Sequence, residues 1–513
     1  CRSNSNLGHT LLQSLVSLSV LSAVLIAPMR AQNDFSARFE EIKKSATDEQ
    51  LYRFLYDLPK GGDLHNHQDG AVWPEWWYQV ATDPVKTHGD TFYTRTRILD
   101  SKNSPIMYYN TIPKWRYDRL PEAIKAEYEP LANLDAPTKA KWLASLWLGD
   151  LGDGREKFFE QIWPRIFGML NSPYVTIELL VENMKRFGAE GVRYIETQNL
   201  VFGLGAPTEF HDKDGNAISV DQMADLYRER LRQPDAIATG VTVRFQAVVL
   251  RFTPSAEQGV EDAYAFVDRH RDLWVGINMA GREDNEKGYP GRFLSVYRKM
   301  MGKYPAISLS IHAGESDEPN HHVRDTLFLG AQRIGHGVNL LSDPETMEAM
   351  RANKNLVEIN LISNKLLGYI TNFDDHPFPR FMRFGIPVCL NTDDRGMWGS
   401  TLTDEYFVAV KHFNLSWAEL TQLASNSLEY SFVQPSEKQR LIDSYNAAVQ
   451  RFESRYSADW KSTVAAVNAT GSPYAAREFG SSCRFDRPLA LGALGALGVT
   501  GAIFGSGDCP DAS

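Results

Sequence analysis

Five short polar motifs recur along this chain, each at the end of an apolar run of the kind that forms a β-strand. They are His65-Asn66-His67, Gly281, His312-Ala313-Gly314-Glu315, His336-Gly337 and Asp393-Asp394. Imidazole and carboxylate groups rarely end strands for packing reasons, because a buried polar group without a partner costs free energy. Their repeated placement at strand ends therefore indicates that these side chains take part in catalysis or in ligand binding.

Three histidines and one aspartate suit one divalent transition metal, most often zinc. Once such a set is taken from the motifs, Glu315, His336 and Asp394 remain as acid/base groups that do not bind the metal. The motifs together predict a metal-activated water molecule surrounded by groups that transfer protons.

The elements that must position these residues follow from the apolar runs. Strands are predicted at 61–67, 191–197, 241–249, 274–281, 307–313, 333–338, 356–361 and 386–393. Helical patterns fill most of the gaps, at 222–232, 260–270, 294–303, 323–332, 344–353 and 377–384. Strands that alternate with helices predict an α/β fold with a parallel sheet, and eight of them predict a (β/α)8 TIM-type barrel.

In such a barrel the active site lies at the C-terminal ends of the strands. The polar motifs end the first, fourth, fifth, sixth and eighth predicted strands. Five separate motifs would therefore meet on one rim of the barrel, which is hard to produce by chance.

The composition is that of a large folded protein. The chain has 513 residues, of which 43% are hydrophobic, enough for a large core and additional segments. The net charge of −10 argues against a nucleic-acid partner, which would favour a basic face. Homo-oligomerisation is left open.

Residues 1–31 have the pattern of a signal peptide. Arg2 precedes an uncharged run at 11–28, and Ala31 provides a small residue for cleavage before Gln32, although Met29 is larger than the pattern prefers. We expect a secreted or periplasmic protein, and the alternative is an uncleaved membrane anchor. A helical segment is expected at 32–58.

The barrel is predicted over 59–456, with an insertion at about 71–153 after the first strand. The insertion is rich in aromatic residues, including Trp73, Trp76 and Trp77. Because it leaves the barrel on the catalytic face, it could form a lid over the site. The alternative, which we favour, is a small satellite core.

After the last strand, helices are expected at 420–430 and 437–456. An Ala/Gly-rich tail follows at 457–513, with a loose stretch at 462–486. Its uncharged end is either a disordered glycine-rich tail or a segment in contact with a membrane. Cys389 is expected to be a buried thiol, and Cys483 and Cys509 could pair in an oxidising compartment.

The ordered motifs resemble those of the adenosine deaminase family. The segments that carry this resemblance are PKGGDLHNHQDG (59–70), GINMAG (276–281), HAGE (312–315), RIGHG (333–337) and NTDD (391–394). The run at 59–62, ISN at 362–364 and the stretch at 426–441 are similar to the secreted, growth-factor-related branch of that family, which also carries an insertion after the first strand. The resemblance extends over 58–452.

This resemblance implies one zinc ion per chain, bound by His65, His67, His312 and Asp393. It implies zinc-dependent hydrolytic deamination of adenosine, and of 2′-deoxyadenosine, to inosine and ammonia. The zinc would lower the pKa of a water molecule, and the resulting hydroxide would attack the purine carbon that bears the amino group.

The resemblance also implies roles for five further residues. Glu315 would donate a proton to the adjacent ring nitrogen, which requires a raised pKa. His336 would orient the water and stabilise developing charge, and Asp394 would contact the water or the purine. The backbone N–H of Gly281 would bind the purine, and Asp69 would bind a ribose hydroxyl.

Three residues depart from the pattern of the family. Asn278 replaces the usual acid of the fourth strand, Arg282 follows Gly281, and Arg395 stands where proline is usual. They leave the metal and proton-transfer residues intact and affect how the substrate is held. The alternatives are a deaminase of another purine or modified nucleoside, and a catalytically inactive growth-factor-like binding protein, against which the intact Glu315 argues.

Overall fold

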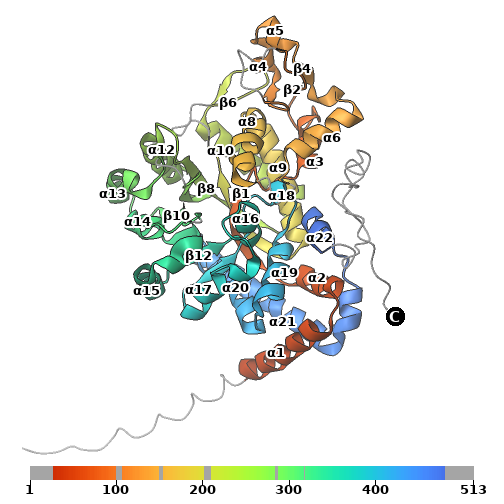
Figure 1. Cartoon of the computed structure of the whole chain (residues 1–513), viewed down its shortest axis with the longest axis vertical. Helices are drawn as coiled ribbons and strands as arrows, with labels where there is room; N and C mark the ends of the chain where they lie inside the picture. Colours follow the sequence, from red (N-terminus) through yellow and green to blue (C-terminus); the bar gives the residue numbers. More distant parts are fainter. Residues whose placement is uncertain are drawn as a thin grey trace, which may run out of the picture.

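An eight-stranded parallel sheet forms the centre of the molecule (Figure 1). The computed structural model describes residues 27–99, 107–148, 154–201, 209–283, 287–316 and 318–479. The strands, in their order around the sheet, are β1 (Gly61–His67), β5 (Val192–Asn199), β8 (Thr242–Leu250), β9 (Trp274–Ala280), β10 (Ser308–Ala313), β11 (Arg333–His336), β12 (Leu356–Ile359) and β13 (Val388–Leu390). The predicted α/β barrel is therefore confirmed.

The sheet curls until its two edge strands meet. Asn66 of β1 bridges to Asp393, in the loop after β13, in parallel orientation. Asp393 N donates to the His65 carbonyl at 2.9 Å, and His67 N donates to the Asp393 carbonyl at 3.3 Å. The backbone that closes the barrel is thus the backbone of three predicted metal ligands.

Helices cover the outside of the barrel, and their ends follow local sequence signals. They are α9 (Pro173–Ala189), α10 (Val220–Leu231), α12 (Ala256–Arg269), α13 (Leu294–Lys303), α14 (His322–Phe328), α15 (Pro344–Asn353) and α17 (Phe378–Phe384). A capping box between Ser219 and Gln222 begins α10, and the Asp343 side chain caps α15. The bounds of α13 and α15 are those predicted.

The chain segments before and after the barrel pack together at one end of the molecule (Figure 1). Helices α1 (Ala27–Ser45) and α2 (Asp48–Asp57) lie against α20 (Trp417–Glu429) and α21 (Pro435–Ala465). Aromatic rings form this contact, with the Phe35 and Trp417 ring centres 4.5 Å apart and those of Phe54 and Tyr456 4.9 Å apart. These two N-terminal helices occupy most of the segment at 32–58.

The prediction that the tail is loose at 462–486 is wrong for the first part of that stretch. Helix α21 continues to Ala465, and a further helix, α22 (Pro473–Glu478), follows. Trp460 and Tyr474 are buried, so their rings anchor this segment to the rest of the protein. The Ala- and Ser-rich composition concealed them.

The insertion after β1 folds into a layer of its own at the opposite end of Figure 1. Strands β2 (Phe92–Arg95), β3 (Thr111–Pro113) and β4 (Tyr128–Pro130) form an antiparallel sheet in the order β3-β2-β4. Helices α3 (Pro74–Ala81) and α6 (Ala136–Ser145) pack against each other beside it.

The tryptophans of the insertion are packed, as the satellite-core alternative requires. The Trp73 and Trp76 rings stack at 5.4 Å, and the Arg186 guanidinium lies over both. Trp77 is buried, and Trp142 Nε1 donates to Thr111 Oγ1 at 2.9 Å.

Several predictions concern residues that lie outside the described ranges. These include most of the signal peptide, at 1–26, and the end of the tail at 480–513, with Cys483 and Cys509. Helix α1 begins at Ala27 and runs through the predicted cleavage site after Ala31. Within the described ranges no helix is both long and apolar enough to cross a membrane. Cys389 is a buried free thiol, as predicted.

Arg395 fixes the loop that closes the barrel. Its guanidinium is buried, with Nη1 2.6 Å from Glu190 Oε1, Nη2 donating to Asn183 Oδ1 at 2.9 Å, and the group lying 3.6 Å above the Phe187 ring. The other carboxylate oxygen of Glu190 accepts from Thr403 N and Oγ1. The family's usual proline is thus replaced by a buried ion pair that ties this loop to the end of α9.

Replacing Arg395 by Met should strongly destabilise the protein. The change leaves the Glu190 carboxylate buried without its cation, which costs about 3–5 kcal/mol. Urea unfolding of the full chain measures the loss. The control is Arg351→Met, whose partner Glu348 forms an exposed pair expected to contribute at most about 1 kcal/mol. Equal stability losses in the two variants would show that the pair does not fix the loop.

Candidate metal centre and active site

Four side chains converge at the C-terminal ends of β1, β10 and β13. They are His65 and His67 of β1, His312 of β10 and Asp393, and their ligand atoms all lie within 4.8 Å of one another. Asp393 Oδ1 lies 3.2 Å from His67 Nε2 and 3.7 Å from His65 Nε2, and the Nε2 atoms of His67 and His312 are 3.3 Å apart. The structure therefore brings together the four residues predicted to bind the metal.

The donor atoms fit a cation. Within the described part of the chain, His65 Nε2 and Asp393 Oδ1 are buried and have no hydrogen-bond partner. Buried polar atoms are normally paired, and several that face one another need a common partner. Three imidazoles and a carboxylate in this arrangement suit one divalent metal such as zinc.

Neighbouring side chains orient the ligands. His65 Nδ1 lies 2.7 Å from Glu358 Oε2, His312 Nδ1 lies 2.9 Å from Asn278 Oδ1, and Ser363 Oγ donates to Asp393 Oδ2 at 2.6 Å. When Nδ1 of an imidazole donates to an oxygen, its Nε2 lone pair is left for a metal.

Asn278, a departure from the family, belongs to a chain of buried hydrogen bonds with a defined direction. Gln246 Nε2 donates to Glu196 Oε2 at 3.2 Å, and Asn278 Nδ2 donates to Gln246 Oε1 at 3.0 Å. Because a carboxylate only accepts, this order leaves Asn278 Oδ1 to accept from His312. An amide thus performs the task of the missing acid.

Arg333 connects Glu358, which contacts His65, with Glu196, which begins the hydrogen-bond chain to His312. Its Nη2 lies 2.6 Å from Glu196 Oε2, and its Nε lies 2.7 Å from Glu358 Oε1. Burial would raise the pKa of Glu358, but the Arg333 charge and the hydrogen bond with His65 lower it. Glu358 therefore stays ionised and accepts from His65.

Glu315 lies beside the ligands on a loop held by Glu283. The Glu283 carboxylate accepts from the backbone N–H groups of Gly314 and Glu315 at 3.0 and 3.2 Å and lies 3.0 Å from His322 Nδ1. Burial, followed by the negative charges of Asp393 and Glu283, raises the pKa of Glu315 well above its ordinary value. The surroundings of Glu315 therefore favour its protonated form, the form that a general acid needs.

The backbone is strained at two of the site residues. His336 has φ = 67° and Asp393 has φ = 52°, both in the left-handed region that side chains rarely adopt. Gly335, which precedes His336 in β11, permits close packing against His65, because a Cβ there would lie 2.6 Å from Cε1 of the His65 ring. Ordinary strand ends would not bring these groups together.

A cavity of about 410 Å³ opens onto the metal ligands. Glu315, His336 and Asp394 line it together with His67, His312 and Asp393, and Gly281 lies on its wall beside the Phe252 ring. Burial, with the charges of Asp393 and Glu315, raises the pKa of Asp394 well above its ordinary value.

Asp69 does not line this cavity. It is buried, and burial raises its pKa to about 7. Its negative charge nevertheless helps to raise the pKa of Asp394. Its contact with a ribose hydroxyl stays a prediction.

The aromatic wall of the cavity comes from a segment that the sequence did not single out. Phe158 and Phe159 belong to the π-helix η2 (Phe158–Ile162), and Trp163 and Phe167 belong to α8 (Trp163–Leu170). The Trp163 ring centre lies 6.0 Å from that of His67. A single-turn π-helix often marks a functional site.

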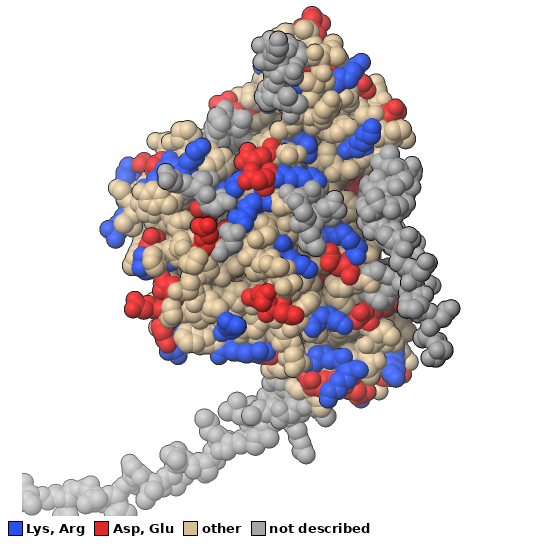
Figure 2. Space-filling view, viewed as in Figure 1, with Lys and Arg blue, Asp and Glu red and all other residues tan. Residues whose placement is uncertain are grey.

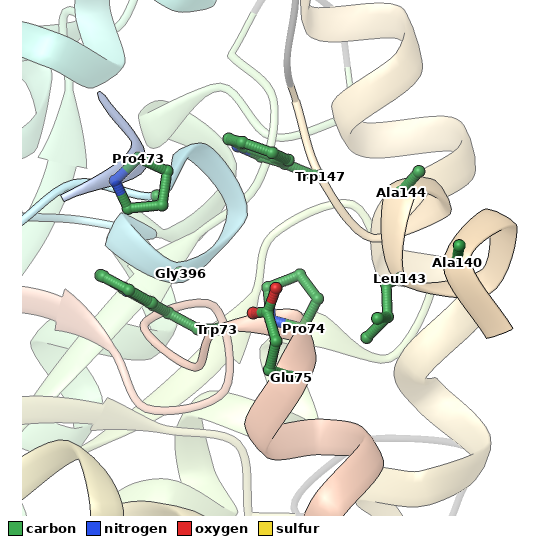
Figure 3. A pocket seen from close by; sticks show the side chains of 10 residues that line it. Trp73, Pro74, Glu75, Ala140, Leu143, Ala144, Trp147, Gly396 and Pro473 are labelled. Carbon is green, nitrogen blue, oxygen red and sulfur yellow. The ribbon is translucent and has the colours of Figure 1, made fainter. Parts of the chain in front are cut away.

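None of Trp73, Trp76 and Trp77, the residues of the lid alternative, lines the cavity at the metal ligands. Trp73 lines a separate hollow of about 20 Å³ with Pro74, Trp147 and Pro473 (Figure 3). This hollow includes no metal ligand and has room for little more than a water molecule. The aromatic surface for a substrate therefore begins at Phe158, beyond the predicted end of the insertion.

Two further residues of the site were missed, although signals for them exist. Glu358 is a lone acid in an apolar strand, an unusual position that demands a buried cationic or hydrogen-bonding partner. His376 follows no motif in the sequence, yet it is buried next to Asn364, whose amide contacts His336.

Replacing His312 by Ala should abolish stable metal binding, because it removes one of the four ligands that converge on the site. Metal content per folded chain, by elemental analysis after dialysis, measures the effect. The control is His412→Ala, which removes a partly exposed imidazole paired with Asp374. Full metal occupancy in the His312 variant would exclude this residue as a ligand.

Comparisons with known proteins agree with the geometry. The sequence model of the adenosine deaminase family matches residues 157–448. An adenosine deaminase of Aedes albopictus is 26% identical over 437 residues, which are 80% of this chain and 76% of that protein. An adenosine deaminase of Aliivibrio fischeri (strain MJ11) is 36% identical over 169 residues, 33% of this chain, and the match spans about half of that relative, 50%.

Solved structures share the fold at low sequence identity. An N6-methyl-AMP deaminase from Arabidopsis thaliana has a TM-score of 0.57 and 19% identity, covering 78% of this chain and 99% of that one. An adenine deaminase from Arthrobacter aurescens has a TM-score of 0.54 and 19% identity, covering 76% and 99%. Because the family match spans more than half of the 513 residues, this chain belongs to the adenosine deaminase family, whose members are hydrolases that act on C–N bonds.

Proposed function

We propose that this chain deaminates adenosine, and 2′-deoxyadenosine, to inosine and ammonia with one bound zinc ion. The observation that carries the proposal is a single cavity in which the buried Glu315 carboxyl, whose pKa is raised by its surroundings, lies beside the four candidate metal ligands. The aromatic wall from Phe158 to Phe167 suits the apolar face of a purine.

The residues of the site divide the reaction between them. Bound zinc supplies a hydroxide nucleophile near neutral pH. Glu315 donates its proton to the ring nitrogen next to the carbon that bears the amino group, which makes that carbon electrophilic. His336 orients the attacking water and stabilises developing charge, and Asp394 contacts the water or the purine. Gly281 N–H holds the ring.

A purine nucleotide is a second candidate substrate, because the cavity also has cationic lining residues. Arg282 and Lys287 both line it, and Arg282 Nη1 lies 2.8 Å from Glu156 Oε1 at its edge. A substrate phosphate would compete with Glu156 for Arg282. Lys and Arg side chains are otherwise interspersed with Asp and Glu on the face shown in Figure 2, which supports a small-molecule partner rather than a nucleic acid.

Ammonia release by the purified protein tests the proposal. Adenosine, 2′-deoxyadenosine, adenine and AMP are compared, before and after removal of the metal by a chelator and after its return. We expect turnover of the nucleosides, loss with the chelator and recovery with zinc. Preference for AMP would favour the nucleotide, and no turnover by metal-loaded protein would favour the inactive binding protein.

Replacing Glu315 by Gln should preserve the fold and the bound metal while removing most activity. Glutamine has the same shape but cannot protonate the purine, and general acid catalysis contributes about 10²–10⁴-fold. The turnover number and the metal content are measured together, with the exposed Glu348→Gln as the control. Activity within the range of the parent enzyme would exclude Glu315 as the acid.

We further propose that residues 1–31 direct export, as expected for the secreted, growth-factor-related branch. N-terminal sequencing of the protein from its native host tests this, with a mature start near Gln32 as the expected result. An intact N-terminus on protein inside the cell would contradict it.

A further inference from the structure

A chain of buried hydrogen bonds leads from the start of α17 to His336, and its first donor is unambiguous. The backbone N–H of Phe378 donates to His376 Nδ1 at 3.1 Å. Burial lowers the pKa of His376 to about 3, so its ring is neutral. A neutral ring whose Nδ1 accepts must carry its proton on Nε2.

The next link fixes the orientation of an amide. His376 Nε2 lies 3.1 Å from Asn364 Oδ1, which must therefore accept, and this places the Asn364 NH₂ group on the other side. That NH₂ group lies 3.0 Å from His336 Nδ1, and the Asn360 NH₂ group lies 3.2 Å from the same atom. Two donors thus converge on Nδ1 of His336.

His336 must consequently carry its own proton on Nε2. The Nε2 atom of His336 is buried and has no hydrogen-bond partner among the described residues. It lies 3.8 Å from Glu315 Oε2, and His336 itself lines the substrate cavity. The arrangement is the reverse of that at His65 and His312, whose Nδ1 atoms face oxygen acceptors. Those two rings offer lone pairs to the site, whereas His336 offers a proton.

We propose that Asn364 and His376 are positioning residues that hold His336 in its Nε2–H tautomer, so that His336 enters the reaction as a hydrogen-bond donor and not as a base. The donor would bind the attacking oxygen and stabilise the charge that develops on it. The same tautomer keeps His336 out of the metal's ligand set, because the nitrogen that faces the cavity has no free lone pair. The catalytic part of this inference rests on the proposed deaminase function.

The tautomer can be read directly in the full chain labelled with ¹⁵N-histidine. Two-bond ¹⁵N–¹H correlation spectra distinguish the protonated ring nitrogen from the unprotonated one, and His336→Gln assigns the signals. We expect His336 to be protonated on Nε2 in both the metal-free and the zinc-loaded protein, without any substrate present. Protonation on Nδ1 in the native protein overturns the inference.

Asn364→Asp should reverse the tautomer. The new carboxylate can still accept from His376 but cannot donate to His336, so the His336 proton should move to Nδ1. Turnover should then fall about 10- to 100-fold, with KM and zinc content unchanged. The matched control is Asn355→Asp, the same change at a residue whose amide donates to Ala331 and Gln332 carbonyls before β12. A native tautomer with native turnover in the Asn364 variant contradicts the proposal.

A second pair of variants covers the case in which Asn364→Asp does not fold. His376→Phe removes the donor to Asn364 and should lower both turnover and the Nε2–H population. His376→Gln retains an N–H at that position and should restore much of both. Equal effects of the two variants would reduce His376 to a packing residue. A native protein with the expected tautomer but no turnover of any purine would overturn the proposed function and not the tautomer.

Discussion

The hydrogen bonds that close the barrel are also the bonds that assemble the metal site. Asp393 pairs through its backbone with His65 and His67, and the side chains of the same three residues belong to the group of four that could hold a metal ion. Closure of the sheet therefore sets the distances between ligands from opposite edges. We call this contact between β1 and the loop after β13 the seam. Asp63 strengthens the seam, because its carboxylate accepts from Thr392 N and Oγ1 at 3.1 and 2.7 Å.

Around this seam the barrel interior is polar, and its hydrogen bonds have a direction. Buried ion pairs such as Arg333 with Glu196 and Glu358 often contribute less stability than apolar packing of the same volume would. Here the hydrogen bonds around these ion pairs place oxygen acceptors at Nδ1 of His65 and of His312. The chain of hydrogen bonds from His376 instead places an N–H donor at Nδ1 of His336. Three similar imidazoles thus acquire two different roles from their surroundings.

Local patterns in the sequence predicted what local physics determines. The bounds of β1, α13 and α15 agree with the apolar runs and caps, and the four ligands follow from polar residues at strand ends. The bond between His65 and Glu358 joins residues 293 positions apart, and no local pattern records it. The wall at Phe158 was missed for a similar reason, because an aromatic run does not state whether it faces a core or a cavity. The tail was misjudged because two buried rings, Trp460 and Tyr474, anchor a segment of otherwise weak composition.

The seam also affects how the protein can fold during its synthesis on the ribosome. Asp63 and Thr392, which meet across it, are 329 residues apart, so β1 emerges long before its partner exists. Until then the edge of β1 that does not pair with β5 stays open, and such edges are prone to wrong association in slowly folding chains of high contact order. Complete coordination of a metal must likewise wait until nearly the whole barrel has been synthesised. A metal held by these residues would therefore bind late, and its binding would report that the chain has closed correctly.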